Sequence, residues 1–185
     1  MYAYEEKKQP SILKLILTVA IFIAVAMYGI ISLSTGDPLW FYTTFDAQPA
    51  TITVYCYGQE TVLTPGSQDF DQLTAIFNEN FSGYKNWDSL SMSEDTWSYY
   101  QTSDAMMLIV FAYPQDIRVH STYKYFHAVD TLIIPLDGRH SKSNAVFGMT
   151  NDIPASGAMH MMDKSPLSKY LSDHALCAPS VTASN

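Results

Sequence analysis

The sequence predicts an α+β protein in which one N-terminal transmembrane helix is followed by a mainly antiparallel sheet with two or three packed helices. Three observations support this prediction. An uncharged apolar stretch of nineteen residues runs from Leu15 to Leu33. Several short β-branched and aromatic runs follow it, separated by turn residues, as is typical of strands joined by hairpins. Other segments carry apolar residues at helical spacing.

The apolar stretch is long enough to cross a bilayer, because nineteen helical residues at about 1.5 Å each cover roughly 28 Å. Three lysines precede it (Lys7, Lys8 and Lys14), and no Lys or Arg occurs in the fifty residues after Ser34. This asymmetry predicts a cytoplasmic N-terminus and an exported, periplasmic domain on the cell (inner) membrane. The stretch exceeds a signal-peptide core and lacks an A-x-A cleavage pattern, so we expect an uncleaved signal anchor.

The chain is thus expected to have five parts. In order they are a cytoplasmic N-terminus (1–10), the transmembrane signal anchor (11–34), a juxtamembrane connection (35–49), an exported α+β domain (50–177) and a C-terminal tail (178–185). Aromatic residues are enriched where membrane meets water, so we expect Trp40, Phe41 and Tyr42 at the membrane interface. The connection is too short for a free tether, which predicts a domain close to the membrane surface.

Charge restricts the partners of the exported part. The segment after Ser34 holds seven basic and sixteen acidic residues, a formal charge of −9. Such a surface repels nucleic acid and anionic lipid head groups. We therefore expect no nucleic-acid partner, and the sequence identifies no small-molecule substrate. The expected partners are other membrane-protein subunits and the lipid bilayer that holds the anchor.

The first half of the domain shows a hairpin and a helix. Thr51–Tyr57 is β-branched and aromatic, Gly58-Gln59 is a turn, and Glu60–Leu63 can return as the partner strand. Ser67 predicts a helix cap. Behind it, apolar residues recur at helical spacing and define the face expected to pack on the sheet: Phe70, Leu73, Phe77 and Phe81.

The second half is expected to supply most of the sheet. Gly83–Ser91 is expected to be a loop, and Ser91–Glu94 has the form of a capping box before a short helix around Trp97. Ala105–Tyr113 suits a central strand buried on both faces, with a short buried helix as the alternative. The remaining expected elements are strands at Ile117–His120, Tyr123–Phe126, Thr131–Leu136 (with Pro135 near an edge or a strand end) and Ala145–Met149, and a helix from Ser165-Pro166.

Cys56 and Cys177 are the two cysteines of the chain. Outside the cytoplasm they can form a disulfide that ties the first strand to the C-terminal segment. The alternative is two buried free thiols. Neither cysteine lies in C-x-x-C-H, and two thiols are too few for an iron–sulfur cluster, so no cofactor is expected.

The run Met159-His160-Met161-Met162 combines thioether and imidazole groups, the ligands that suit Cu(I). These four residues are the weak metal candidates of the sequence. Neighbouring residues of a strand point to opposite faces, so only two of the four could easily converge, and methionines are also ordinary packing residues. The prediction for metal is accordingly none.

No catalytic residue is predicted. The five histidines match no metal spacing, and the chain has no G-x-S-x-G elbow and no phosphate-binding glycine loop. A non-enzymatic protein is therefore expected. A hydrolase stays open as an alternative if His120, His127 or His140 meets a carboxylate and a nucleophile in one pocket.

Two segments, Leu63–Gly66 and Leu132–His140, resemble pieces of uncharacterised bacterial membrane-anchored exported domains. The layout of one span and a small domain is similar to accessory subunits of bacterial respiratory and photosynthetic complexes, such as alternative complex III. This resemblance implies a non-catalytic accessory subunit of a larger membrane complex, an electron-transfer assembly in particular. The alternative is a free-standing, membrane-anchored binding or sensing module, with copper as its sharpest ligand.

Overall fold

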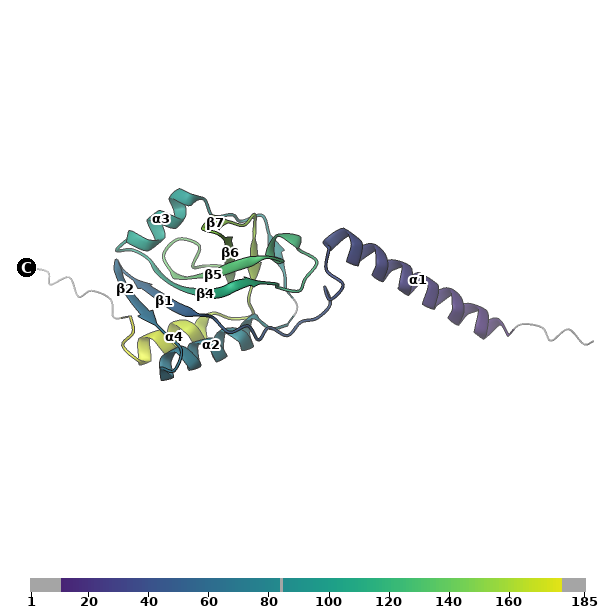
Figure 1. Ribbon diagram of the computed structural model, residues 1–185, viewed down its shortest axis with the longest axis horizontal. Coiled ribbons are helices and arrows are strands. Elements are labelled where there is room, and N and C mark those ends of the chain that lie inside the picture. Colours follow the sequence, from purple (N-terminus) through teal and green to yellow (C-terminus); the bar gives the residue numbers. More distant parts are fainter. Residues whose placement is uncertain (1–10, 84, 178–185) are drawn as a thin grey trace, which may run out of the picture.

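The computed structural model describes residues 11–83 and 85–177. Its first element, α1 (Ile12–Thr35), is an apolar helix that projects away from the rest of the chain (Figure 1). No residue of α1 is buried. Within the described residues it is the one helix long and apolar enough to cross a membrane. This agrees with single-pass membrane anchoring near the N-terminus.

The domain after α1 is built on an antiparallel sheet of eight strands in the described part of the chain. They are β1 (Thr51–Cys56), β2 (Gln59–Leu63), β3 (Trp87–Asp88), β4 (Met107–Ile117), β5 (Val129–Asp137), β6 (Ala145–Thr150), β7 (Ile153–Pro154) and β8 (Ala158–His160). The strand order is β2-β1-β4-β5-β6-β8-β3, and β7 pairs with β6. The predicted α+β fold with a mainly antiparallel sheet is confirmed.

Helices cover both faces of this sheet. The helices α2 (Gln68–Phe81) and α4 (Ser165–Asp173) lie side by side on one face, and α3 (Glu94–Thr102) lies on the other (Figure 1). On the α2 face, Phe77 stacks on Phe111 of β4 with ring centroids 4.3 Å apart. On the α3 face, Tyr100 is fully buried.

The apolar run at 105–113 forms the central strand β4, as expected. Its side chains alternate: Ile109 and Phe111 enter the core beneath α2 and α4, whereas Leu108 and Val110 enter the core beneath α3. Residues 108–111 of β4 are all buried because a hydrophobic core lies on each side of them, which is why this stretch shows no polar alternation. The alternative of a short buried helix is therefore wrong.

The start of α3 differs from the expected capping box. The residue that caps the helix is Ser93, whose hydroxyl accepts the Thr96 N–H at 3.2 Å. Ser91 lies too far upstream, because the capping residue must directly precede the first helical residue, Glu94. Ser67 caps α2 as predicted, through the Phe70 N–H at 3.3 Å.

Two predicted strands, 117–120 and 123–126, are wrong. β4 ends at Ile117, and Lys124–Phe126 is a 3-10 turn. The buried Ser121 explains the difference, because its hydroxyl accepts the Tyr123 N–H at 3.2 Å and closes a tight loop. The segment 83–91, expected to be a loop, contains the short strand β3. The short strands β7 and β8 were not predicted. The expected cytoplasmic segment 1–10 and the tail 178–185 lie outside the described residues.

Candidate functional site

The C-terminal end of α1 is joined directly to the domain. Gly36 has a φ of 71°, and its N–H donates to the Ser32 carbonyl at 3.0 Å, which closes the helix in the left-handed conformation that glycine adopts without strain. Nη1 of Arg118 donates to the Gly36 carbonyl at 3.2 Å. A cation thus meets the negative end of the helix dipole, where it is stabilising.

Asp37 follows at once and is fully buried between two histidines. Its Oδ1 and Oδ2 lie 3.1 and 3.0 Å from Nδ1 of His120, and Oδ2 lies 3.7 Å from Nε2 of His127. Oδ1 also accepts the Leu39 N–H at 2.9 Å. We call this set of residues the junction: Gly36, Asp37, Arg118, His120 and His127.

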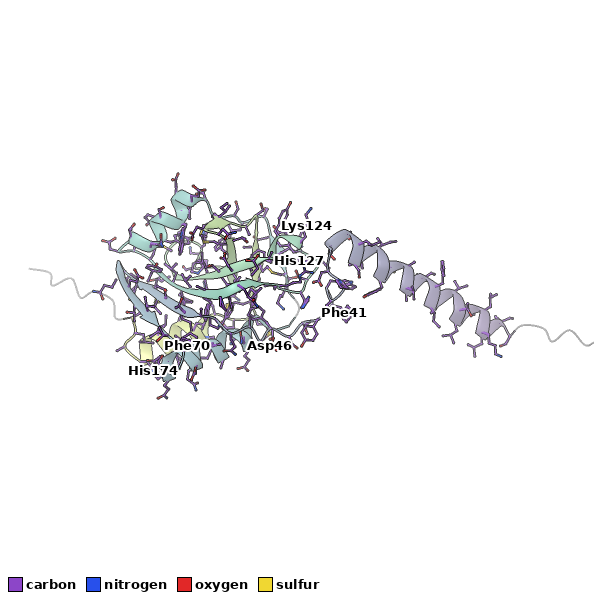
Figure 2. All side chains as sticks on the ribbon, in the orientation of Figure 1. Phe41, Asp46, Phe70, Lys124, His127 and His174 are labelled. Atoms are coloured by element: carbon purple, nitrogen blue, oxygen red, sulfur yellow. A yellow bond between two sulfur atoms is a disulfide. The ribbon has the colours of Figure 1, made fainter. Side chains whose placement is uncertain are left out.

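The surroundings of Asp37 favour the charged form of its carboxyl group. Burial acts to raise the pKa of this carboxyl, but the Leu39 N–H, the His120 hydrogen bond and the charges of both histidines outweigh it and lower the pKa. Burial lowers the pKa of His127, and nearby Arg118 and His120 lower it further. Figure 2 shows His127 and Lys124 at the end of the domain nearest α1.

The expected interface aromatics lie beside the junction and fold back along α1. Phe41 and Tyr42 are 55% and 44% exposed. The Phe41 ring lies 6.3 Å from that of Tyr28, and the Tyr28 hydroxyl donates to the Pro38 carbonyl at 3.1 Å. Tyr28 precedes the end of α1 by seven residues, or roughly 10 Å of helix. The segment after α1 therefore runs beside its last two turns.

A cavity of about 160 Å³ opens next to the junction. Three segments line it, residues 40–43, the Gly83 and Lys85 pair, and residues 120–122. Lys85 is 7% exposed, and its Nζ donates to the carbonyls of Thr43 and Gly83 at 3.0 and 3.3 Å. Burial lowers the pKa of Lys85 to about 8.

The structure brings some of the hydrolase elements together and leaves others apart. His120 and His127 share the carboxylate of Asp37, and His120 and Ser121 line the same cavity. The Ser121 hydroxyl, however, donates to the Tyr123 carbonyl at 3.3 Å and accepts the Tyr123 N–H, so it serves the loop. His140 belongs to a different cluster, where it hydrogen-bonds the Tyr100 hydroxyl of α3.

The four weak metal candidates do not converge. Met159 and Met161 are buried in the core beneath α2 and α4. His160 hydrogen-bonds Asp88 with 2.7 Å between Nε2 and Oδ2, and Met162 is 59% exposed. In residues 11–83 and 85–177, no group of three or more His, Cys, Asp or Glu side chains could hold a metal ion.

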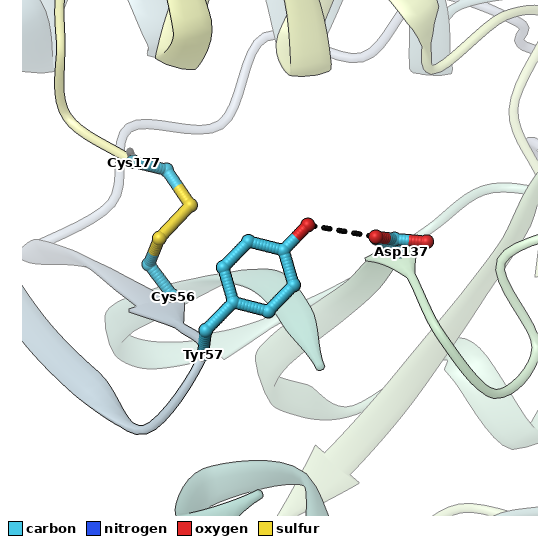
Figure 3. The surroundings of a disulfide bond; sticks show 4 residues. All are labelled: Cys56, Tyr57, Asp137 and Cys177. Carbon is cyan, nitrogen blue, oxygen red and sulfur yellow. Dashed lines mark hydrogen bonds between the residues drawn. A yellow bond between two sulfur atoms is a disulfide. The ribbon is translucent and has the colours of Figure 1, made fainter. Parts of the chain in front are cut away.

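The two cysteines form a disulfide that joins the end of β1 to the segment after α4 (Figure 3). The Cα atoms of Cys56 and Cys177 are 5.5 Å apart. Next to it, the Tyr57 hydroxyl donates to Oδ2 of Asp137 at 2.7 Å, which with burial raises the pKa of Tyr57 to about 12 (Figure 3). The disulfide and this hydrogen bond fix the β1–β2 turn to the segment after α4 and to the end of β5.

No protein-family model matches the sequence, and comparisons with curated proteins and with solved structures also found no match. The site is therefore assigned from geometry alone. Sequence reasoning named His120, His127 and the aromatic residues 40–42, but it missed Asp37, Lys85 and Arg118. One signal was present, since Lys85 is the first basic residue after the apolar stretch.

Proposed function

We propose that this chain is a non-catalytic accessory subunit of a larger bacterial membrane complex, in particular an electron-transfer assembly. The observation that supports the proposal most is the junction, in which Asp37 is fully buried and bonded to His120 of the domain at 3.0 Å. A module that acts alone can hang on a flexible tether. A subunit that docks on neighbours needs a fixed height and orientation above the membrane, and the junction supplies both.

The surface of the domain offers a second argument. Trp87 and Tyr125 are each 50% exposed, and both rings pack against Tyr123, with ring centroids 4.3 and 5.4 Å from it. We call these three residues the aromatic cluster. Tyr and Trp are enriched in protein–protein interfaces. Lys124, between two members of the cluster, lies at the end of the domain nearest α1 (Figure 2), where a neighbouring membrane subunit could reach it.

The proposed orientation places the N-terminus in the cytoplasm and the domain on the exported side. The lysines before α1 and the lack of Lys or Arg in the fifty residues after Ser34 support it. The Cys56–Cys177 disulfide supports it as well, because disulfides persist in oxidising compartments.

The test is native gel electrophoresis of membranes extracted in mild detergent, with mass spectrometry and an absorption spectrum of the band. We expect migration in a multi-subunit band, coloured if the complex transfers electrons. Tyr125→Ala should weaken this co-migration, whereas Tyr99→Ala, an equally exposed tyrosine on α3 (47%), should not. Migration of the wild-type protein near its own mass would contradict the proposal.

The second candidate is a free-standing anchored binding or sensing module. The cavity beside Lys85 favours it, because a concave site with a few polar groups is the usual form of a small-ligand site. A protein that migrates alone and still binds a ligand in this cavity would support it over the first. Copper is disfavoured as that ligand, since the side chains of Met159–Met162 point apart.

A further inference from the structure

Lys85 is a buried cation without a counter-charge. It is 7% exposed, and within the described residues no carboxylate forms an ion pair with its Nζ. The buried carboxylate of the junction, Asp37, is already shared by His120 and His127. An ammonium group withdrawn from water without a partner charge is costly. The feature therefore indicates an anion that the protein itself does not provide.

A second buried lysine, Lys164, provides a comparison, because all three N–H donors of its ammonium group are hydrogen-bonded. Nζ of Lys164 donates to three carbonyls, those of Pro135 at 3.0 Å, Ser143 at 2.8 Å and Ser141. An ammonium has three N–H donors, so Lys164 has none left. Lys85 uses only two of its three, on the carbonyls of Thr43 and Gly83. Both of these residues line the cavity, and Nζ also lies 5.4 Å from the centre of the Phe81 ring. The third N–H has no hydrogen-bond acceptor among the described residues.

Two further residues of the site line the same cavity, Trp40 and His120. His120 uses Nδ1 on Asp37, so its Nε2 has no hydrogen-bond partner in the described part of the chain. The charged donor that the cavity offers is the third N–H of Lys85. An anionic group is its complement.

Size and position identify the source of that group. A cavity of about 160 Å³ is close to the ~150 Å³ that accommodates benzene, and it is well below the ~300–1,000 Å³ of sites for drug-sized molecules. One phosphate-sized group fits, and a whole lipid does not. Phe41 packs beside Tyr28 of α1, which puts this wall of the cavity at the level where an anchored helix leaves the bilayer. A lipid headgroup is the anion available at that level.

The charges near the cavity favour an anionic lipid headgroup, although the overall charge of the domain does not. Seven Lys or Arg residues follow α1, and three of them lie at the α1 end of the domain: Lys85 by its bond to Thr43, Arg118 by its bond to Gly36, and Lys124 as seen in Figure 2. The formal charge of −9 that predicts repulsion from anionic lipids is thus unevenly distributed. Three of the seven cations therefore lie at the end of the domain nearest the membrane.

We propose that the cavity binds the phosphate of an anionic phospholipid in the leaflet next to the domain. Nζ of Lys85 pairs with the phosphate, next to the walls formed by Trp40 and His120. The acyl chains stay in the bilayer beside α1. The bound phosphate supplies the missing counter-charge and holds the domain on the membrane. This role goes beyond that of an accessory subunit and does not depend on any partner protein.

The test uses the full-length protein in a phospholipid-free detergent and native mass spectrometry. The added probes are dioctanoyl phosphatidylglycerol, dioctanoyl phosphatidylcholine and inorganic phosphate. We expect the wild-type protein to bind phosphatidylglycerol at least about tenfold more tightly than phosphatidylcholine, since a charge-assisted hydrogen bond is worth about one such factor. Lys85→Met should remove this preference. Lys142→Met, the same change at an exposed lysine, should keep it.

A melting curve establishes that each variant is folded. If Lys85→Met does not fold, the wild-type protein is compared at pH 7 and pH 9, because Lys85, whose pKa is lowered to about 8, loses its charge between them; the preference for phosphatidylglycerol should fall about tenfold. Equal binding of the two lipids by wild type, or equal effects of Lys85→Met and Lys142→Met, would overturn the proposal. So would displacement of the lipid by inorganic phosphate at the same concentration, or by a short-chain quinone.

Discussion

The carboxylate of Asp37 and the imidazole of His120 are 83 residues apart in the chain and lie 3.0 Å apart in the structure. Asp37 is the second residue after α1, and His120 lies three residues after the end of β4. This hydrogen bond and the one from Arg118 to the Gly36 carbonyl connect the end of the membrane helix to the end of the central strand. A tilt of α1 relative to the domain would have to break these contacts.

Replacing Asp37 by Asn should loosen the junction. Asn keeps the shape and the hydrogen bond to Leu39, but it removes the charge that both histidines face. We expect a loss of about 2 kcal/mol of unfolding free energy, in the range for hydrogen bonds to charged groups. Thermal melting in detergent measures it, and proteolysis within 36–49 should become faster. Asp116→Asn, at an exposed carboxylate, should change neither.

The buried ammonium of Lys85 should make stability rise in alkaline solution. Its pKa is lowered from 10.5 to about 8 by burial, so between these values the unfolded chain binds more protons than the folded one. Stability then increases as pH rises through this window, by about 3 kcal/mol in total at ~1.4 kcal/mol per pH unit. Below pH 8 the full cost of the buried charge is present.

The measurement compares wild type with Lys85→Met from pH 7 to 9 in phospholipid-free detergent, about one pH unit below the ordinary pKa of tyrosine. The groups facing Lys85 are the Thr43 and Gly83 carbonyls, the Phe81 ring and, across the cavity, His120. The difference in melting temperature should move in favour of wild type as pH rises. A constant difference would show that Lys85 does not change its protonation in this range.

Reduction of the Cys56–Cys177 disulfide should destabilise the domain strongly. The bond joins residues 121 positions apart, and the chain-entropy model gives about 5 kcal/mol for a loop of this length. The variant with both cysteines changed to Ala should melt at the same temperature as reduced wild type. Alkylation under denaturing conditions, with and without prior reduction, gives the independent check. Equal masses in the two samples would mean that the bond is absent from the isolated protein.

The elements that the sequence predicts well are those that carry their own signal. Ser67 and the apolar spacing up to Phe81 predict α2 because the cap and the buried face lie within one segment. The continuous apolar run predicts β4, since burial on both faces removes any polar alternation. The strands β3, β7 and β8 are two or three residues long, too short to show a period.

The site was harder to predict because its contacts are between segments. His120 carries no local sign that a carboxylate from the end of α1 will reach its Nδ1. The segments 117–120 and 123–126 contain residues that favour strands. Between them, however, the Ser121 hydroxyl accepts the backbone N–H of Tyr123, and the chain forms a loop. That loop turns His120 and His127 toward Asp37. Tertiary contacts here override a local preference for strand.

Gly157 should be irreplaceable, because it lies where the aromatic cluster meets the sheet. Its φ is 76°, and a Cβ at this position would come 2.1 Å from the Tyr123 hydroxyl and 2.7 Å from the Asp88 carbonyl. Gly157→Ala thus adds a steric clash to the cost of a left-handed alanine, and we expect the free energy of unfolding to fall by about 3 kcal/mol, measured by thermal melting.

Gly66→Ala is the matched control, since Gly66 has a φ of 94° and open space around it. Its loss should be only about 1 kcal/mol, the backbone cost alone. Because Tyr123 packs against both Trp87 and Tyr125, Gly157→Ala should also weaken co-migration with partner subunits, and Gly66→Ala should not. Equal destabilisation by the two substitutions would show that the backbone, and not the packing of Tyr123, sets the requirement for glycine.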